Sequence, residues 1–360
     1  MWNNLPPDLL ANIFSYLPPH SLARAMVTCH HWHNCGRSTS GQTRRHQLHQ
    51  PWFIALPTRS RQLCFVHNPV EKSWHLLNLE HVPSLTRPVS TIGGHGLILF
   101  KFTGGVPIRL SMCNPFTGEI HHLPPLQKSR TNPAVGVIES CPNRFKLYAA
   151  GGMSKAASGG AASFEPTLEM FDSISNTWTV MGSMPVEFAV RLTVWTPNDS
   201  VFSNGVLYWM TSARAYSIMG FDMGTNKWKE LSAPMGDTLE FAALVPRESK
   251  LAVIGGTLGG DVLVWELGDG GKWNVIEKMP TEFSKILAGG CTTKCVGIEG
   301  AVCLFRDLAS GMVVWRRAGY HKNKWEWCSI EGCNQVKGRR LDNYLIKGLF
   351  VHPNLASPFV

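Results

Sequence analysis

A short pattern recurs along most of this chain: a strand-like apolar run ends in Asn or Asp, and a tryptophan follows six residues later. The pattern occurs at Asn68–Trp74, Asp172–Trp178 and Asp222–Trp228. The side chain of Asn or Asp can accept a hydrogen bond from the backbone two residues ahead, which starts a tight turn. Each unit therefore predicts two neighbouring strands of an antiparallel sheet, with the tryptophan on the second strand.

Divergent copies of the unit extend the pattern. Asn114-Pro115 is followed by His121 near the place of the aromatic residue, and Trp273 and Trp325 mark two further copies. The reference positions 74, 121, 178, 228, 273 and 325 are separated by 47, 57, 50, 45 and 52 residues. A period near 50 built from strands and turns is typical of kelch-type propeller blades, which must stack and close into a ring to bury both faces. We therefore expect an all-β propeller over residues 51–360, with six blades favoured over seven.

Other features refine this expectation. Gly151-Gly152 and Gly255-Gly256 each end an apolar run, and we expect both pairs to adopt positive φ at turns inside the blades. The small and polar stretch 154–163 is interpreted as a loop between two strands of the third blade. The strand-like run 344–351 is expected to close the ring by pairing with an early blade. The structural residues of the blades are then Trp74, Trp178, Trp228, Trp273, Trp325, Gly151, Gly152, Gly255 and Gly256.

The first 36 residues follow a different, helical period. Apolar side chains recur three and four residues apart, first between Leu5 and Leu17 and then from Leu22 onward, with Asp8 and Asn12 on the opposite side. A segment of this size is too short to bury a stable core alone. The segment therefore needs a partner surface, which is either the rest of its own chain or another protein. Residues 37–50, polar and basic, are interpreted as a linker with room for a short helix.

The order and spacing of the apolar anchors in this segment resemble an F-box. The anchors are Leu5, Pro6, Leu9, Leu10, Ile13, Phe14, Leu17, Leu22, Val27, Cys29 and Trp32. With the repeats behind it, the whole chain resembles plant F-box/kelch-repeat proteins, and the ending Gly348-Leu349-Phe350-Val351 with the Asn-Pro turns is similar to one branch of that family.

The resemblance implies a role as the substrate-recognition subunit of a Skp–cullin–F-box ubiquitin ligase. The helices would bind the Skp-type adaptor by helix-in-groove contact, and through it the cullin and the RING subunit. The propeller would hold a target protein, with loops 154–163 and 195–200 as candidate contacts. Because adaptor-facing residues and core residues are both apolar, the sequence does not divide the anchors between these two roles.

Composition and charge limit the alternatives. The net charge of +9 is diffuse, and no basic stripe interleaved with aromatic residues accompanies it, so direct nucleic-acid binding is not expected. No apolar run approaches the ~18 residues that span a bilayer. Met1-Trp2-Asn3-Asn4 is not a secretory leader, so we expect a nuclear or cytoplasmic protein whose 10 cysteines are reduced thiols.

Chemistry by the chain itself is not expected. Cys29-His30-His31-Trp32-His33-Asn34-Cys35 is rich in metal-ligand types, but it holds no Cys-x-x-Cys pair and Cys29 coincides with an F-box anchor. No phosphate loop, dinucleotide fingerprint or nucleophile elbow occurs. We therefore assign no catalytic residue, metal or cofactor. The alternatives are an interaction scaffold whose helices self-associate without ubiquitin transfer and, less favoured, a propeller hydrolase.

Overall fold

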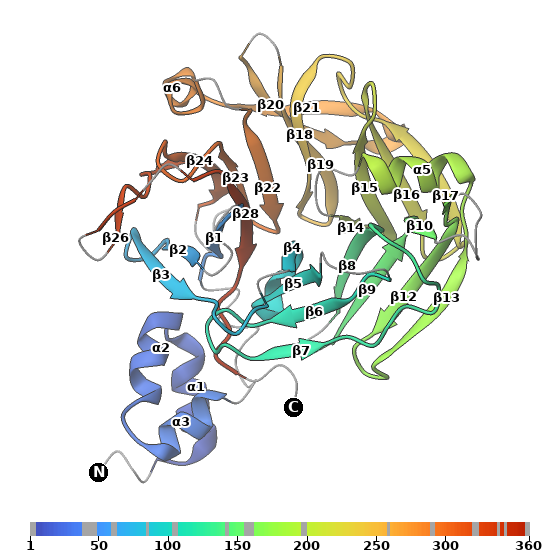
Figure 1. Cartoon of the computed structure of the whole chain (residues 1–360). Coiled ribbons are helices and arrows are strands. Elements are labelled where there is room, and N and C mark those ends of the chain that lie inside the picture. The colour runs from blue at the N-terminus through green and yellow to red at the C-terminus, as the bar shows by residue number, and fades with distance from the viewer. Residues whose placement is uncertain are drawn as a thin grey trace.

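The chain folds into three N-terminal helices and a ring of antiparallel sheets (Figure 1). The structure is a computed structural model that describes residues 5–37, 49–58, 63–83, 86–102, 107–140, 144–154, 162–195, 200–257, 260–288, 292–318, 324–336, 339–341 and 344–356. The expected linker helix falls on residues 38–48, which lie outside the described residues.

The helical module consists of α1 (Pro7–Tyr16), α2 (Pro19–Met26) and α3 (His30–Arg37). A proline occupies the first position of both α1 and α2, where its missing N–H has no partner to lose. Gly36 of α3 is buried against Met26 of α2, and a Cβ at Gly36 would overlap that side chain. Glycine at this position therefore allows α2 and α3 to approach closely.

Six four-stranded antiparallel sheets form the blades, which confirms six blades and excludes seven. From the innermost strand outward, the first three blades are β28 (Ile346–Val351), β1 (Trp52–Pro57), β2 (Leu63–Asn68) and β3 (Ser73–Asn78); β4 (Thr86–Ile92), β5 (Leu97–Phe102), β6 (Leu110–Cys113) and β7 (Ile120–His122); and β8 (Ala134–Ser140), β9 (Arg144–Ala150), β12 (Thr167–Asp172) and β13 (Thr177–Ser183). The last three are β14 (Val201–Ser203), β15 (Val206–Ser212), β16 (Tyr216–Asp222) and β17 (Lys227–Ser232); β18 (Leu239–Arg247), β19 (Lys250–Thr257), β20 (Val262–Leu267) and β21 (Trp273–Lys278); and β22 (Lys294–Ile298), β23 (Ala301–Phe305), β24 (Met312–Arg317) and β25 (Trp325–Ile330).

The ring closes as the sequence predicted. The C-terminal strand β28 is the innermost strand of the first blade and pairs with β1 from Trp52↔Val351 to Pro57↔Ile346. The first blade therefore contains strands from both ends of the propeller, and this pairing closes the ring.

The predicted Asn and Asp turns are confirmed between the third and fourth strands of the first four blades. In each turn a side-chain Oδ1 accepts a backbone hydrogen bond two residues ahead: Asn68 from Val70 (3.0 Å), Asn114 from Phe116 (3.0 Å), Asp172 from Ile174 (2.8 Å) and Asp222 from Gly224 (2.9 Å). Two residues further on, the backbone turns left-handed at Lys72, Gly118, Asn176 and Asn226, respectively. The repeat in the sequence is thus a repeat of one turn geometry.

The tryptophans of the repeat all lie on the outermost strands. Three of them donate an indole hydrogen bond to the preceding blade: Trp74 to the carbonyl of Glu331 (2.9 Å), Trp178 to Pro124 (2.9 Å) and Trp273 to Ser232 (2.8 Å). Trp325 instead stacks on Trp315 of its own blade, at 4.1 Å between ring centroids. In the second blade the equivalent register position, opposite Cys113, is Ile120, so assigning it to His121 was wrong by one residue.

The first glycine pair behaves as predicted. Gly151 and Gly152 directly follow β9 and have φ of +67° and +103°. A Cβ on Gly152 would also lie 2.8 Å from the carbonyl oxygen of Thr131. Both conformation and space therefore require glycine at this turn.

The second glycine pair does not form a turn. Gly255 and Gly256 lie inside β19 and pair with Leu263 and Val262 of β20. A Cβ on Gly256 would overlap the ring of Phe241 on the neighbouring strand. The prediction of positive φ was therefore wrong here, because close packing within the sheet and not a turn selects glycine.

Shorter elements decorate the ring. A two-stranded sheet of β10 (Met153–Ser154) and β11 (Ser163–Phe164) flanks the insertion between the second and third strands of blade 3, where the loop was expected, although residues 155–161 lie outside the described part. The others are α5 (Val186–Val194), α6 (Ser284–Leu287), β26 (Gln335–Val336), β27 (Arg339–Arg340) and the 3-10 turns η2 (Gly93–His95), η3 (Asp269–Gly271) and η4 (Thr281–Phe283). None of the described helices has the length and apolar character needed to cross a membrane.

Candidate functional site

The helical module divides its apolar anchors between an interior and an exterior. Leu10, Phe14 and Leu22 are buried, with exposed fractions of 1%, 2% and 2%, and Met26 completes this core. The ring of Trp32 packs edge-on against Phe14, at 5.5 Å between centroids. These side chains hold the three helices together and are not available to a partner.

The other face of α1 is apolar and exposed to solvent. Leu9 is 49% exposed, Ile13 46% and Tyr16 56%, and their spacing of four and three residues places them on one side of the helix. Val27, at the end of α2, is 85% exposed. We refer to Leu9, Ile13 and Tyr16 as the α1 stripe. Tyr16 was not among the predicted anchors, although its place three residues after Ile13 could have indicated it.

The remaining anchors lie at the margins of the module. Pro6 is exposed and precedes α1, whereas Leu5, Leu17 and Trp32 are half-buried against the core. Cys29 is half-buried just before α3. The Sγ of Cys29 accepts a hydrogen bond from the backbone N–H of Trp32 at 3.5 Å, so it caps the start of α3. Within the described residues, no three His, Cys, Asp or Glu side chains come together as a metal site would require.

The module is seated on the outer turns of blades 1 and 2 (Figure 1). Arg37 of α3 pairs with Glu119 of the β6–β7 turn, with 2.8 Å between Nη2 and Oε1. Arg24 of α2 lies 3.8 Å from Glu71 of the β2–β3 turn. These pairs are half-exposed or exposed, so each contributes little free energy, but together they match basic helices to acidic turns. Part of the N-terminal basic charge therefore faces the propeller itself.

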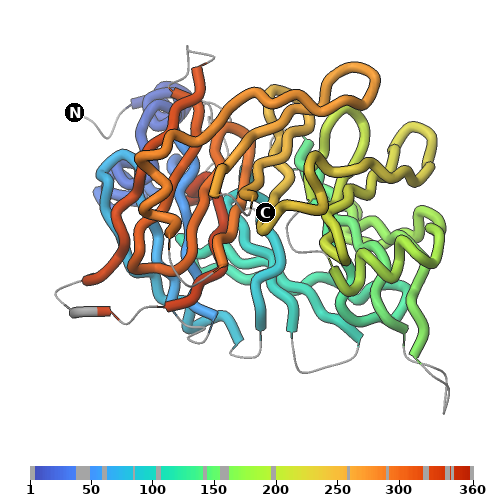
Figure 2. The backbone as a smooth tube through the Cα atoms, turned by 90° about the horizontal axis from the view of Figure 1, so that it is seen from above, coloured from blue at the N-terminus to red at the C-terminus, as the bar shows by residue number. Residues whose placement is uncertain are grey.

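The two faces of the ring differ. Because strands alternate in direction, the turns between third and fourth strands, where the helices sit, share one face with the turns between first and second strands. The connections between second and third strands, and those between blades, lie on the opposite face. That face carries α5, α6 and the insertion flanked by β10 and β11. Figure 2 shows the helices (blue) beside the first blade, away from α5.

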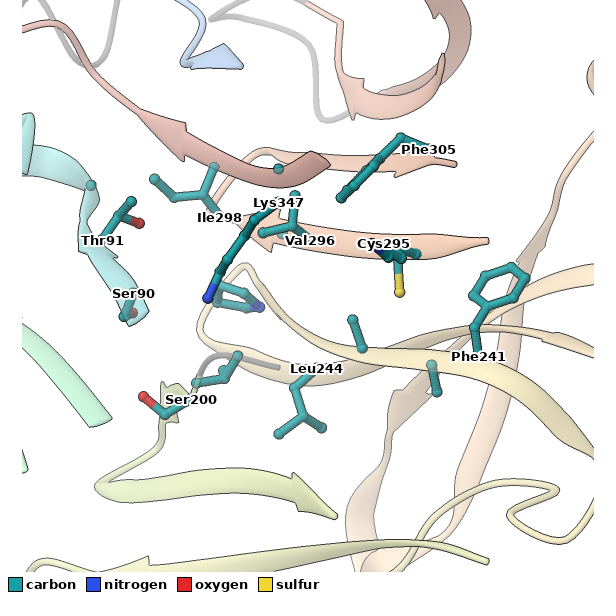
Figure 3. Close-up of a pocket in the computed structure, with 18 of the residues that line it drawn as sticks. Ser90, Thr91, Ser200, Phe241, Leu244, Cys295, Val296, Ile298, Phe305 and Lys347 are labelled. Atoms are coloured by element: carbon teal, nitrogen blue, oxygen red, sulfur yellow. The ribbon is translucent and has the colours of Figure 1, made fainter. Parts of the chain in front are cut away.

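A cavity of about 690 Å³ occupies the centre of the ring. Ser90 and Thr91 of β4, Leu244 of β18 and Val296 of β22 are among its lining residues, and Figure 3 shows that they come from different blades. The Nζ of Lys347 donates to the carbonyl of Val89 at 2.6 Å, which ties β28 to β4. The cavity is thus lined by polar and apolar side chains of the inner strands, and Lys347 links two of these strands.

The cavity is also lined by the thiol of Cys295 and the hydroxyl of Ser200. Burial raises the pKa of Cys295, which keeps it a neutral thiol and a poor nucleophile. The Oγ of Ser200 accepts a hydrogen bond from the backbone N–H of Val137 at 3.0 Å. Neither group is therefore arranged as an activated nucleophile would be.

Comparison with known proteins agrees with both parts of the fold. A family model described as F-box-like matches residues 2–40, and one described as an F-box associated beta propeller domain matches residues 65–258. Two solved structures are more distant: a SapL1 lectin (TM-score 0.43, 13% identity, 80% of this chain and 99% of that one) and TolB from Acinetobacter baumannii (TM-score 0.47, 8% identity, 84% and 66%).

Three relatives from Arabidopsis thaliana illustrate the similarity. F-box only protein 6 is 25% identical, with 98% of this chain and 74% of the relative aligned. The protein UNUSUAL FLORAL ORGANS, whose branch the chain's ending resembles, is 23% identical over 100% of this chain and 87% of its own length. An F-box/kelch-repeat protein is 26% identical over 78% and 70%. The chain belongs to the family of proteins with an F-box associated beta-propeller domain, here preceded by an F-box-like helical module.

Proposed function

We propose that this protein is the substrate-recognition subunit of a Skp–cullin–F-box ubiquitin ligase. The observation that carries the proposal is the α1 stripe: Leu9, Ile13 and Tyr16 remain exposed although the module already has a closed core of its own. A row of apolar side chains at helical spacing on a short helix fits a helix-in-groove contact. A Skp-type adaptor is the partner that the F-box-like match suggests.

The stripe is large enough to matter energetically. Leu9 and Ile13 each expose about half of their side chains, so covering both would stabilise a complex by about 2 kcal/mol through apolar burial. Tyr16 adds an aromatic ring, a residue type enriched among the side chains that dominate interfaces. Val27 extends the apolar surface at the end of α2.

In this proposal the propeller binds a target protein and the chain performs no chemistry. The target lies on the face with α5 and the insertion, because long connections there offer adaptable contacts, whereas the helices occupy turns of the other face. The adaptor links the chain to the cullin and RING subunits, and ubiquitin transfer is promoted by proximity. We also propose that the protein acts in the nucleus, the cytoplasm or both. Of the candidate loops, residues 155–161 and 196–199 lie outside the described part.

The test is co-purification of the full chain with an Arabidopsis Skp-type adaptor. Leu9→Asp with Ile13→Asp should abolish adaptor binding, because two carboxylates would be buried in an apolar contact. Val275→Asp is the matched control, since Val275 is an aliphatic side chain of the outer strand β21 and is 58% exposed. Equal adaptor binding by all three proteins would refute the proposal.

The same preparation separates the alternatives. A scaffold that self-associates through α1 would form dimers without adaptor, and Leu9→Asp with Ile13→Asp would convert them to monomers. A hydrolase would show substrate-dependent turnover that the stripe variant retains. Either result, together with absent adaptor binding, would replace the proposed function.

A further inference from the structure

The chain returns to the helical module after the ring has closed. Behind β28, residues 352–356 leave the first blade and run under the helices. Asn354 is 3% exposed and is held at both ends of its amide group: its Nδ2 donates to the carbonyl of His95 (3.1 Å), and its Oδ1 accepts from the backbone N–H of Ala356 (2.9 Å). Its backbone carbonyl accepts from the Nδ2 of Asn114 at 2.8 Å. This segment is therefore fixed on blade 2.

The next residue belongs to the other module. Leu355 packs against the core of the helices, which consists of Leu10, Phe14, Leu22 and Met26. Asn354 and Leu355, adjacent in the chain, thus anchor in the propeller and in the helices, respectively. The hydrogen bonds of Asn354 are directional, and Leu355 packs against the core of the helices. Together these contacts restrict rotation of the helical module relative to the propeller.

The turn residues beneath the helices support this reading. Asn68 and Asn114 are fully buried, whereas Asp172 and Asp222, which make the same turn in blades 3 and 4, are partly exposed. The shared Oδ1 contact to the backbone would be made equally well by Asn or Asp. What distinguishes the covered turns is the Nδ2 donor, which at Asn114 reaches the carbonyl of Asn354. A carboxylate there would be buried facing another oxygen, an unfavourable arrangement.

We propose that Asn354 and Leu355, seated on Asn114, form a tether that sets the orientation of the helical module relative to the propeller. The three are positioning residues: they keep the α1 stripe and the target face of the ring in one fixed relation. The part of this inference that concerns ubiquitin transfer rests on the proposed function, whereas the fixed geometry does not. A rigid receptor holds a bound target at a defined distance from the adaptor, which raises the effective concentration of the reacting groups.

The experiment measures the distance between the modules in the full chain. Genetically encoded spin-labelled residues replace the exposed Asn34 of α3 and the exposed Thr179 of β13, so the native cysteines stay untouched. Pulsed electron resonance then gives the distribution of label distances. The parent chain should show one narrow distribution.

Asn114→Asp is the decisive variant, because it keeps the turn contact to Phe116 and replaces the donor to Asn354 with a carboxylate oxygen that faces the carbonyl. Asp222→Asn is the matched control, since it makes the reverse exchange in the same turn of an uncovered blade. We expect a broadened distribution for Asn114→Asp and for Leu355→Ala, and an unchanged one for Asp222→Asn. Unchanged distributions in both tether variants would overturn the tether, and so would equal broadening in the control.

Adaptor pull-down with the same variants distinguishes this inference from the proposed function. Both tether variants leave Leu9 and Ile13 in place, so they should retain adaptor binding while the distances broaden. If the parent chain does not bind the adaptor but shows a narrow distribution of label distances, the ligase role is refuted and the tether is supported. If Asn114→Asp does not fold, Leu355→Ala carries the test, because Leu355 lies outside every blade.

Discussion

Leu9 and Leu10 are adjacent in the chain, yet replacing them with alanine should have opposite consequences. Leu10 is 1% exposed in the core of the helices, and Leu9 is 49% exposed on the α1 stripe. Truncating a fully buried leucine removes its transfer free energy and leaves a cavity, together about 2–5 kcal/mol. Truncating Leu9 removes about half of the transfer term and leaves no cavity, so we expect about 1 kcal/mol or less.

The size of the module amplifies the effect at Leu10. Within the described residues its fully apolar core is Leu10, Phe14, Leu22 and Met26. A loss of about 3 kcal/mol raises the population of the opened helices roughly 100-fold, since 1.4 kcal/mol is a factor of 10. The hydrophobic clusters of the propeller join neighbouring blades and are separate from the helical core, so the propeller should remain closed while the helices open.

Hydrogen exchange followed by mass spectrometry measures this directly. Peptides covering α1 to α3 should lose protection strongly in Leu10→Ala and only slightly in Leu9→Ala, with peptides of the blades unchanged in both variants. When the two variants are compared at equal folded fraction, Leu9→Ala should weaken adaptor binding more than Leu10→Ala, because only Leu9 lies on the α1 stripe. Similar losses of protection in the two variants would refute the division of the anchors into core and surface.

Two further predictions concern the propeller. Trp273→Phe should lower the unfolding free energy by about 1 kcal/mol more than Trp228→Phe, because Trp273 donates to the carbonyl of Ser232 at 2.8 Å, whereas the indole N–H of Trp228 has no acceptor among the described residues; urea unfolding checks this. The backbone N–H of Thr225 donates to Asp222 and holds the pKa of that carboxyl below its ordinary value. A depressed pKa stabilises the fold above the unfolded value of about 4 and loses this contribution as pH falls further, so Asp222→Asn should flatten the acid side of the stability profile, and an unchanged profile would contradict it.

The blades were predictable from sequence because their determinants are local. The contact from Asn68 to Val70 spans two residues, and so does that from Asp222 to Gly224, so the turn is written in adjacent positions. The pairing of β28 with β1 was predicted only from the need to close a ring, and the structure confirms it. The prediction for Gly256 was wrong because glycine is required there by the ring of Phe241 on a neighbouring strand, and no local sequence pattern reveals this contact.

The candidate site was predictable only as a set of residues. The doublets Leu9-Leu10 and Ile13-Phe14 make the apolar face of α1 wider than one contact can cover. The periodicity therefore indicates that two surfaces meet this helix, but it does not show which residues face each surface. That division depends on where α2 and α3 pack. The position of the helices on the propeller was equally hidden, because Arg37 and Glu119 are 82 positions apart and no sequence pattern links them.

Ring closure and the placement of the helices depend on the same piece of chain. β28 completes the first blade against β1, and the residues directly after it hold Asn114 and the helical core. A shift of β28 by one residue would turn its buried side chains to the other face and also withdraw Leu355 from the helices. The fold therefore couples a closed ring to a correctly oriented helical module. An incompletely closed propeller would leave the α1 stripe in no fixed orientation relative to the face that carries α5, so under the proposed function target capture would depend on completed folding.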